Sequence, residues 1–254
     1  MTFLDGPRPR IIAHRGLASD APENTLLAFL KALSAGATHL ETDVHASADG
    51  EAVISHDPDL SRVAGREVRV DQLTLAELRR IPLGHGQSFS SLAEALDAFP
   101  EARFNIDIKD ERAAAPTAAA IVKTRAADRV LLTSFSAARR RAATSALPDV
   151  AVSPSVSEFV PALIGSKLGT RPLTRRALRG FAAVQIPERR GPVRLVTART
   201  VRAIQAAGAE VHVWTVDDVA DMTRLLDLGV DGIVTNRCDL LKALVSARSE
   251  SPSL

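Results

Sequence analysis

The sequence predicts an α/β fold: a (β/α)8 (TIM) barrel with a small insertion at the barrel mouth after the second strand. Short apolar runs alternate with longer amphipathic segments rich in Ala, Leu and Arg along nearly the whole chain. Eight such pairs occur, and this pattern favours a barrel of parallel strands and outer helices over an open doubly wound sheet. The length of 254 residues suits one such barrel.

The elements are expected in strict alternation. Strands are predicted at 10–14, 39–44, 103–108, 130–134, 150–153, 182–186, 211–215 and 232–235. Helices are predicted at 22–35, 91–99, 113–126, 137–146, 174–179, 197–207, 219–228 and 239–247. Asp20 and Glu23 have capping-box spacing, which places the start of the first helix at Pro22. Gly36, Gly208 and Gly229 stand where three of the helices should end.

The apolar run 52–56 breaks the alternation, because it follows the second strand too closely for a parallel crossover. The dipeptide Asp49-Gly50 is a hairpin signal, so the chain is expected to fold back and return His56 beside Asp43. The cap-like insertion at about 57–90 then holds a short helix at 75–80 and a loop at 84–86. We therefore expect residues 1–254 to form one barrel domain with a small cap.

Composition excludes several classes of protein. Apolar residues make up 46% of the chain and charged residues 24%, as in ordinary globular proteins. The 32 basic and 30 acidic residues nearly balance, and aromatics are only 4%, so no nucleic-acid partner is expected. Cys238 is the only cysteine, which excludes an intramolecular disulfide. Without a signal peptide or an apolar span of 18 residues, a cytoplasmic protein without a membrane span is expected.

Acidic residues recur where two neighbouring strands end. Glu41 and Asp43 are two residues apart, so they face the same side of the second strand, toward the barrel interior. Asp107 and Lys109 repeat this spacing on the third strand. Carboxylates gathered there repel one another and lose hydration, and a hard divalent cation relieves both penalties. Oxygen ligands suggest Mg2+ or Ca2+, not zinc. The alternative is that Glu41 and Asp43 only form salt bridges at the rim.

Two histidines and two cationic side chains complete the candidate site. His14 ends the first strand and is expected across the barrel mouth from His56, where the pair could serve as acid and base. Arg15 can bind two phosphate oxygens. Lys109 is one of only five lysines and suits a single phosphate oxygen. A core role for His14 and a simple Lys109–Asp107 pair remain the alternatives.

Weaker candidates also end strands. Trp214, the only tryptophan, could form the floor of a glycerol pocket or belong to the core. Ser134 and Gln185 could line the same pocket, although a structural role is the simpler interpretation. The remaining histidines are interpreted as structural or surface residues: His39, His45, His85 and His212.

At this point the chain resembles the glycerophosphodiester phosphodiesterase family. The shared motifs are AHRG, PENT, LETDV and a DG…HD stretch, followed in order by NIDIK, LLTSF, VHVWTVDD and GVDGIVTN. They cover nearly the whole chain. The resemblance implies a (β/α)8 barrel and metal-dependent cleavage of glycerophosphodiesters to sn-glycerol 3-phosphate and an alcohol.

The resemblance also implies a role for each candidate residue. His14 and His56 would be the catalytic pair, Glu41, Asp43 and Asp107 the metal ligands, Arg15 and Lys109 the phosphate-binding residues, and Trp214 a neighbour of the glycerol. One divalent cation is expected, Mg2+ or Ca2+, with Mn2+ as a third option. The family usually has Glu as the third ligand, and Asp107 is one methylene shorter.

Two alternatives differ in substrate or in class. A lysophospholipase D or phospholipase-type enzyme on the same barrel would need an apolar lip, and the insertion offers only Phe89 as an aromatic residue. A non-catalytic barrel that binds a phosphate ligand would need no second histidine. A small glycerophosphodiester is therefore the favoured substrate, and the sequence does not indicate an oligomeric state.

Overall fold

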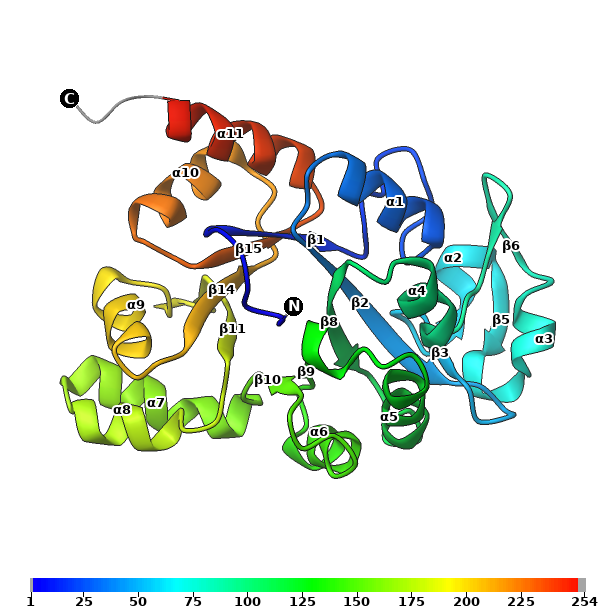
Figure 1. Ribbon diagram of the computed structural model, residues 1–254, viewed down its shortest axis with the longest axis horizontal. Coiled ribbons are helices and arrows are strands. Elements are labelled where there is room, and N and C mark those ends of the chain that lie inside the picture. Colours follow the sequence, from blue (N-terminus) through cyan, green and yellow to red (C-terminus); the bar gives the residue numbers. More distant parts are fainter. Residues whose placement is uncertain (1, 251–254) are drawn as a thin grey trace.

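A computed structural model describes residues 2–250 (Figure 1). The main sheet runs in the order β10-β9-β8-β2-β1-β15-β14-β11, with all of these neighbours parallel. Between its two ends, Ala182 N donates to Val152 O at 2.9 Å, so the sheet nearly closes on itself. The predicted (β/α)8 barrel is confirmed. Residue 1 and residues 251–254, which the predicted domain includes, lie outside the description.

Helices surround the barrel strands (Figure 1). The strands are β1 (Arg10–His14), β2 (His39–Ala46), β8 (Arg103–Ile108), β9 (Val130–Thr133), β10 (Ala151–Val152), β11 (Ala183–Pro187), β14 (Glu210–Trp214) and β15 (Gly232–Thr235). The helices are α1 (Leu26–Ser34), α4 (Leu92–Ala98), α5 (Ala114–Lys123), α6 (Ala137–Thr144), α7 (Val156–Leu168), α8 (Arg171–Ala177), α9 (Ala198–Gln205), α10 (Val219–Asp227) and α11 (Cys238–Glu250), and the 3-10 turn η2 (Ala127–Arg129) precedes β9. Within the described chain, none of these helices is long and apolar enough to cross a membrane.

The main hydrophobic core lies between the sheet and the helices. Alternate strand residues such as Ile11, Phe104 and Ile106 point outward and pack against helix residues such as Phe29 and Ile121. Because side chains alternate along a strand, the residues between them face the barrel interior. Every second residue of a strand can therefore place a binding or catalytic side chain inside the barrel.

The observed helix ends agree only partly with those predicted from the sequence. Gly36, Gly208 and Gly229 have φ of +91°, +95° and +79°, the left-handed geometry predicted at these helix ends. The predicted start of α1 at Pro22 is wrong, because the hydroxyl of Thr25 accepts from Ala28 N at 3.2 Å and caps the helix there. The preceding residues are instead a loop that reaches toward the barrel mouth.

The helix α7 was not predicted from the sequence. One helix, 174–179, was expected between β10 and β11, but two helices occur there, and α8 covers much of the expected one. Pro161 lies inside α7, and with Gly165 it makes the segment look broken in the sequence. Gly165 is required for packing, since a Cβ there would lie 2.6 Å from Thr174 Oγ1 of α8.

The segment after β2 folds back as predicted from Asp49-Gly50. Strand β3 (Ala52–Ile54) pairs antiparallel with β2, with His45 opposite Val53. Ser55 N then donates to Asp43 O at 3.0 Å, which brings the following residue, His56, to the barrel mouth. The predicted return of His56 to the neighbourhood of Asp43 is therefore confirmed.

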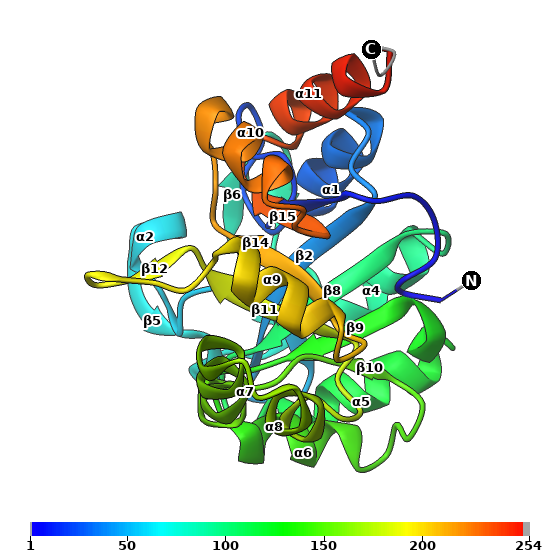
Figure 2. The same cartoon turned by 90° about the vertical axis from the view of Figure 1, so that its left-hand side faces the viewer.

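A small unit with its own hydrophobic cluster follows. Its elements are β4 (Asp59–Leu60), α2 (Ser61–Ala64), β5 (Arg66–Arg69), η1 (Val70–Gln72), α3 (Leu75–Leu78), β6 (Pro82–Gly84) and β7 (Gln87–Ser88). Leu60, Leu78 and Phe89 are buried in it. Figure 2 shows this unit on the same side of the molecule as the hairpin of β12 (Arg189–Arg190) and β13 (Val193–Arg194), away from the N-terminus.

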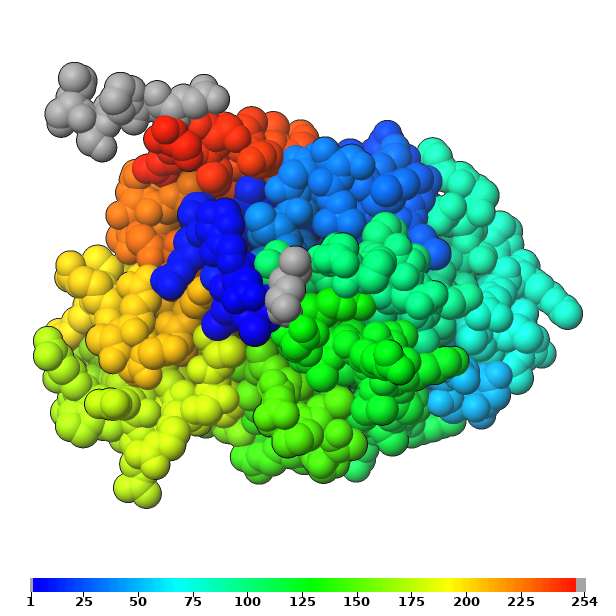
Figure 3. Space-filling model, in the orientation of Figure 1, coloured from blue at the N-terminus to red at the C-terminus, as the bar shows by residue number. Residues whose placement is uncertain are grey.

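The N-terminal segment covers the end of the barrel where the strands begin (Figure 3, dark blue). Phe3 N donates to Asp128 O at 2.8 Å, and the Phe3 ring packs edge-on against His39 with centroids 4.7 Å apart. Under this segment, Arg10 and Glu210 form a buried ion pair at 2.9 Å. The covered end leaves the opposite end, where the strands finish, as the open mouth.

Replacing Glu210 with glutamine is expected to lower the free energy of unfolding by about 3 kcal/mol, because Arg10 would keep a buried charge without its partner. Burial tends to raise the pKa of Glu210, but His212 and Arg10 lower it to about 2. This stabilisation is present above the ordinary carboxyl pKa of 4.5 and is lost as the pH falls toward 2. Urea unfolding at pH 7 and pH 3 measures both effects. The exposed Glu67→Gln is the matched control, and equal stability of the two variants at pH 7 would contradict the prediction.

Candidate active site

A cavity of about 560 Å³ opens at the barrel mouth. All eight residues predicted from the sequence line it: His14, Arg15, Glu41, Asp43, His56, Asp107, Lys109 and Trp214. Seven of them, all but Trp214, form one polar half together with Asn105. The other half is apolar and comes from the ends of β11 and β14 and from the loops and helices after β9, β10 and β11. The sequence therefore located the residues of one cavity.

Strand register explains why the polar residues meet. In the parallel ladder of β1 and β2, His14 lies opposite Glu41. In the ladder of β2 and β8, Asp43 lies opposite Asp107. Because the spacing of two keeps Glu41 and Asp43 on one face, three carboxyl groups reach the same side of two adjacent strands. The strand positions alone thus gather the acidic group.

The ammonium of Lys109 lies between two of these carboxylates. Its Nζ is 2.8 Å from Asp43 Oδ1 and 2.7 Å from Asp107 Oδ2. Burial would lower the pKa of Lys109, but the two carboxylates raise it above its ordinary value. Burial also tends to raise the pKa of Asp43, yet Lys109 and Arg15 hold it below its usual range. Lys109 is therefore a permanent cation within the acidic group.

Glu41 has no such cation. It is 6% exposed, and in the described part of the chain no Lys or Arg side chain forms an ion pair with it. Its Oε2 accepts a hydrogen bond from Arg15 N at 3.1 Å. Burial and the negative charges of Asp43 and Asp107 raise the pKa of Glu41 well above its ordinary value. Ionisation of Glu41 would therefore be favoured by a further cation in the site.

Several buried polar atoms of the cavity lining make no hydrogen bond to residues 2–249. Two are acceptors, Asp107 Oδ1 and Asn105 Oδ1, and one is a donor, Gln185 Nε2, whereas Arg15 Nε, which also lacks a hydrogen bond of good geometry, lies in an ion pair 3.2 Å from Asp43 Oδ2. Buried polar atoms nearly always have a partner, so such a group in one cavity indicates a ligand. Free acceptor oxygens suit a hard cation. Free N–H donors suit phosphate or hydroxyl oxygens.

The residues present fit a divalent cation. With all three carboxyl groups ionised, they outnumber the cations Lys109 and Arg15 by one before a singly charged phosphodiester enters. A divalent ion balances both charges, and the free oxygen of Asp107 adds an unused ligand. As they are placed, the described His, Cys, Asp and Glu side chains form no group of three spaced to hold an ion. The Lys109 ammonium occupies the space between two of the acids.

His14 has a neutral hydrogen-bond partner. Its Nδ1 lies 2.8 Å from Asn236 Oδ1, while Asn236 Nδ2 donates to Asp217 Oδ2 at 2.7 Å. Because a carboxylate only accepts, Asp217 fixes the amide with its oxygen toward His14, and His14 Nδ1 carries the proton. Burial lowers the pKa of His14, although Asn236 acts in the opposite direction. His14 therefore presents an unprotonated Nε2 within the cavity.

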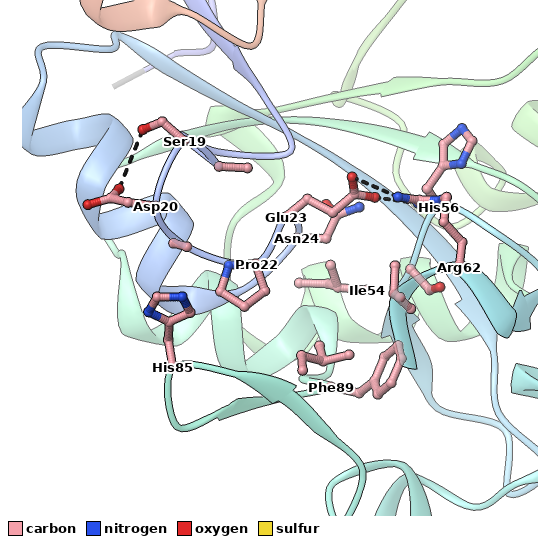
Figure 4. Close-up of a pocket in the computed structure, with 15 residues that line it drawn as sticks. Ser19, Asp20, Pro22, Glu23, Asn24, Ile54, His56, Arg62, His85 and Phe89 are labelled. Carbon is pink, nitrogen blue, oxygen red and sulfur yellow. Dashed lines mark hydrogen bonds and ion pairs between the residues drawn. The ribbon is translucent and has the colours of Figure 1, made fainter. Parts of the chain in front are cut away.

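His56 has a charged partner. Its Nδ1 lies 2.7 Å from Asp57 Oδ1, and Arg62 bridges Asp57 to Glu23. A carboxylate that accepts from Nδ1 fixes the orientation and the tautomer of the ring. Figure 4 shows Glu23 facing Arg62 beside a second cavity of about 380 Å³, which His56 also lines. The two histidines thus have different environments.

The loop before α1 holds Arg15 in place. Arg15 and Asn24 both have positive φ, +57° and +56°, and Asn24 N donates to Arg15 O at 2.9 Å. Asn24 Nδ2 also donates to Asp43 Oδ2 at 3.1 Å. Gly16 is required here, since a Cβ would lie 2.6 Å from the backbone of Ala28. Non-glycine residues with positive φ, such as Arg15 and Asn24, are concentrated at functional sites.

Several residues that position the side chains of the site were given no role in the prediction from the sequence. Asn24 and Glu23 belong to the PENT motif, and Asp57 follows His56 directly, so local motifs carried a signal for them. Asn105 precedes Asp107 by two residues and shares its face. Asn236 and the Arg62 bridge depend on distant segments meeting, and no local pattern indicates such contacts.

Apart from Trp214, the apolar half of the cavity was not predicted. Its lining consists of Phe135, Pro154, Val156, Phe159, Val160, Leu163, Ile186, Pro187, Leu195 and Trp214. Phe135 packs edge-on against Trp214, with ring centroids 6.1 Å apart. Four of these residues come from α7, which the sequence did not predict. Phe89, the aromatic residue considered for a lip, is instead 3% exposed inside the insertion.

Known proteins share this fold and sequence. The chain is 43% identical over 241 residues to the “Probable glycerophosphodiester phosphodiesterase 2” of Mycobacterium tuberculosis, covering 94% of this chain and 91% of that protein. A crystal structure of an Agrobacterium tumefaciens glycerophosphodiester phosphodiesterase matches with a TM-score of 0.75 at 26% identity, covering 93% of this chain and 100% of that one. An Oleispira antarctica phosphodiesterase, solved with the product sn-glycerol-3-phosphate, matches in fold with a TM-score of 0.76 at 24% identity, over 94% and 97% of the two chains. Residues 14–240 match the sequence profile of the Glycerophosphoryl diester phosphodiesterase family, and the chain belongs to this family of enzymes.

Proposed function

We propose that the protein hydrolyses small glycerophosphodiesters to sn-glycerol 3-phosphate and an alcohol. The observation that carries this proposal is the shared cavity, where buried carboxylates, two cationic side chains and two histidines with different partners meet. The product bound to the related Oleispira antarctica phosphodiesterase supports the same substrate class.

The residues that would hold a divalent cation are Glu41, Asp43 and Asp107. Mg2+ or Ca2+ suits this all-oxygen set, with Mn2+ as a third option. When bound, such an ion withdraws charge from the phosphate oxygens and eases attack on phosphorus. Lys109 Nζ and the guanidinium of Arg15 would bind the remaining phosphate oxygens.

The different partners of the two histidines support different roles for them. We infer that His14 Nε2 takes the proton of the attacking oxygen, which comes from water or from the 2-hydroxyl of the glycerol. The new bond to phosphorus forms as the bond to the leaving alcohol breaks. His56, held in place by Asp57, would give a proton to the departing oxygen. With the 2-hydroxyl as nucleophile, water then opens the cyclic phosphate with the two roles reversed.

We infer that Trp214, which lines the same cavity as the phosphate-binding residues, contacts the glycerol. Its indole ring presents a large apolar face, which suits the C–H groups of a glycerol backbone.

That the protein works in the cytoplasm stays a prediction from the sequence, as does the absence of a nucleic-acid partner.

The purified protein is expected to release sn-glycerol 3-phosphate from glycerophosphocholine, glycerophosphoethanolamine or glycerophosphoglycerol when Mg2+, Mn2+ or Ca2+ is added to cation-free protein. An enzymatic assay for glycerol 3-phosphate measures the rate for each headgroup and ion. Tight binding of these compounds without turnover would support the alternative of a binding barrel and contradict the proposal.

A further inference from the structure

Arg62 of the insertion contacts the active site through two carboxylates. It lies in α2, a single helical turn whose neighbouring residues Leu60 and Val63 pack into the hydrophobic cluster of the insertion. Its Nε donates to Asp57 Oδ2 at 2.5 Å, and its two Nη atoms donate to the two carboxylate oxygens of Glu23 at 3.1 Å and 2.5 Å. One planar guanidinium thus binds two carboxylates at once, which the single ammonium of a lysine cannot reproduce.

Each of these carboxylates also holds a side chain of the barrel mouth. Asp57 Oδ1 lies 2.7 Å from His56 Nδ1. Glu23 Oε1 accepts a hydrogen bond from Arg15 Nη1 at 3.1 Å. In Figure 4, dashed lines mark the contact between Glu23 and Arg62. The five side chains form one series of charged contacts from Arg15 to His56, with Arg62 in the middle.

Arg62 balances the charge of both carboxylates. Burial tends to raise the pKa of Asp57, but His56 and Arg62 hold it below its ordinary value. Burial acts in the same direction on Glu23, whose pKa Arg62 and Arg15 lower. Among the described side chains, each carboxylate has one further charged or hydrogen-bonding partner. Loss of Arg62 would leave each carboxylate to that partner alone and draw the partner out of position.

We propose that Arg62 is a positioning residue that couples proton donation by His56 to phosphate binding by Arg15. This inference rests on the proposed function and adds to it a role for the insertion. The coupling is geometric, because one rigid guanidinium fixes both carboxylates and so keeps the proton donor and the phosphate-binding side chain at a constant separation. The alternative is that Arg62 only attaches the insertion to the barrel.

Arg62→Ala is expected to lower kcat for glycerophosphocholine about 10- to 100-fold, because a misplaced catalytic group loses rate of this order. It should also raise KM about tenfold, as expected when a hydrogen bond to a charged group is lost. On the p-nitrophenyl ester of glycerol 3-phosphate, which needs no proton donor, most of the loss in kcat should vanish while the increase in KM remains. A role in attachment alone would not depend on the leaving group.

Arg79→Ala is the matched control. Arg79 belongs to the same insertion, pairs with Glu94 of α4 at 2.7 Å, and has a side chain 47% exposed, against 49% for Arg62. Its kinetic constants should equal those of the wild type. Equal constants in Arg62→Ala and Arg79→Ala would overturn the inference, while cleavage of glycerophosphocholine by the wild type would leave the proposed function intact.

Arg62→Lys serves if alanine destabilises the fold. Lysine keeps the positive charge but cannot bind both carboxylates with the same geometry, so at least one of the two kinetic effects should persist. Wild-type kcat and KM in Arg62→Lys would overturn the geometric coupling.

A double-mutant cycle tests whether Arg62 acts through His56. In the His56→Ala background, Arg62→Ala should lower kcat by less than about threefold, because the group that it positions is absent, while KM should still rise. An undiminished loss of kcat in this background would assign Arg62 to the fold alone and overturn the inference.

Chemical rescue separates a missing guanidinium from a distorted insertion. Arg62 lines the cavity of about 380 Å³, and its side chain is half exposed, so a small solute can reach the place that it vacates. Guanidinium chloride below denaturing concentrations should restore part of kcat in Arg62→Ala, whereas methylammonium should not, since a point charge cannot bind both carboxylates. Equal effects of guanidinium on Arg62→Ala and Arg79→Ala would overturn the inference.

Binding gives a measurement that needs no turnover, because Trp214 is the only tryptophan of the chain. Its fluorescence is expected to titrate with sn-glycerol 3-phosphate at a Kd about tenfold higher in Arg62→Ala than in the wild type or Arg79→Ala. This difference without cleavage of any glycerophosphodiester by the wild type would contradict the proposed function only. Equal Kd values in the three proteins would overturn the coupling of Arg62 to Arg15.

Discussion

Alanine at His14 or at His56 is expected to lower kcat about 10²- to 10⁴-fold in each variant, because each substitution removes a positioned acid or base. The rate of glycerol 3-phosphate release from glycerophosphocholine measures the loss, and circular dichroism verifies the fold. His85→Ala is the control, since His85 is exposed on the insertion and outside the barrel mouth cavity. Near-normal rates in both variants would contradict the proposed proton transfers.

A substrate with a good leaving group separates the two roles. The p-nitrophenyl ester of glycerol 3-phosphate needs no acid, because p-nitrophenolate departs without a proton. His56→Ala should therefore recover most of its lost rate on this ester, whereas His14→Ala should not. The reverse pattern would exchange the roles assigned from Asn236 and Asp57.

Removal of divalent cations by a chelator is expected to lower glycerol 3-phosphate release about 10³-fold, because an ion in this position supplies several kcal/mol of transition-state stabilisation. Mg2+, Ca2+ or Mn2+ should restore the rate of the wild type but not of Asp43→Asn. Asp97→Asn, an exposed change on α4, is the control and should behave as the wild type. Full activity in the presence of excess chelator would contradict the prediction.

Much of the fold could be predicted because it depends on local patterns. The alternation of apolar runs and amphipathic segments is set by short-range periodicity, and it predicted each barrel strand within a few residues. The hairpin at Asp49-Gly50 is likewise a local signal. The helix α7 was not predicted, because Pro161 and Gly165 suggest a loop. Packing against α8 nevertheless stabilises the helix. Tertiary contacts overrode the local signal there.

The polar half of the site could be predicted for the same reason. Glu41 with Asp43, and Asp107 with Lys109, share a face by strand geometry alone. The partners that tune these residues could not be predicted, because Asn236 meets His14 across more than 200 residues of sequence. The position of the Lys109 ammonium between two carboxylates also required coordinates. Apart from Trp214, the apolar half of the cavity was not predicted, and four of its residues belong to α7.

We propose that Glu41, Asp43 and Asp107 together hold one divalent cation between the two histidines. The most direct measurement is a calorimetric titration of cation-free protein with Mn2+. The account predicts one ion bound per chain in the wild type and in Asp97→Asn, and no saturable binding in Asp43→Asn. No binding to the wild type, or equal binding to Asp43→Asn, would contradict it.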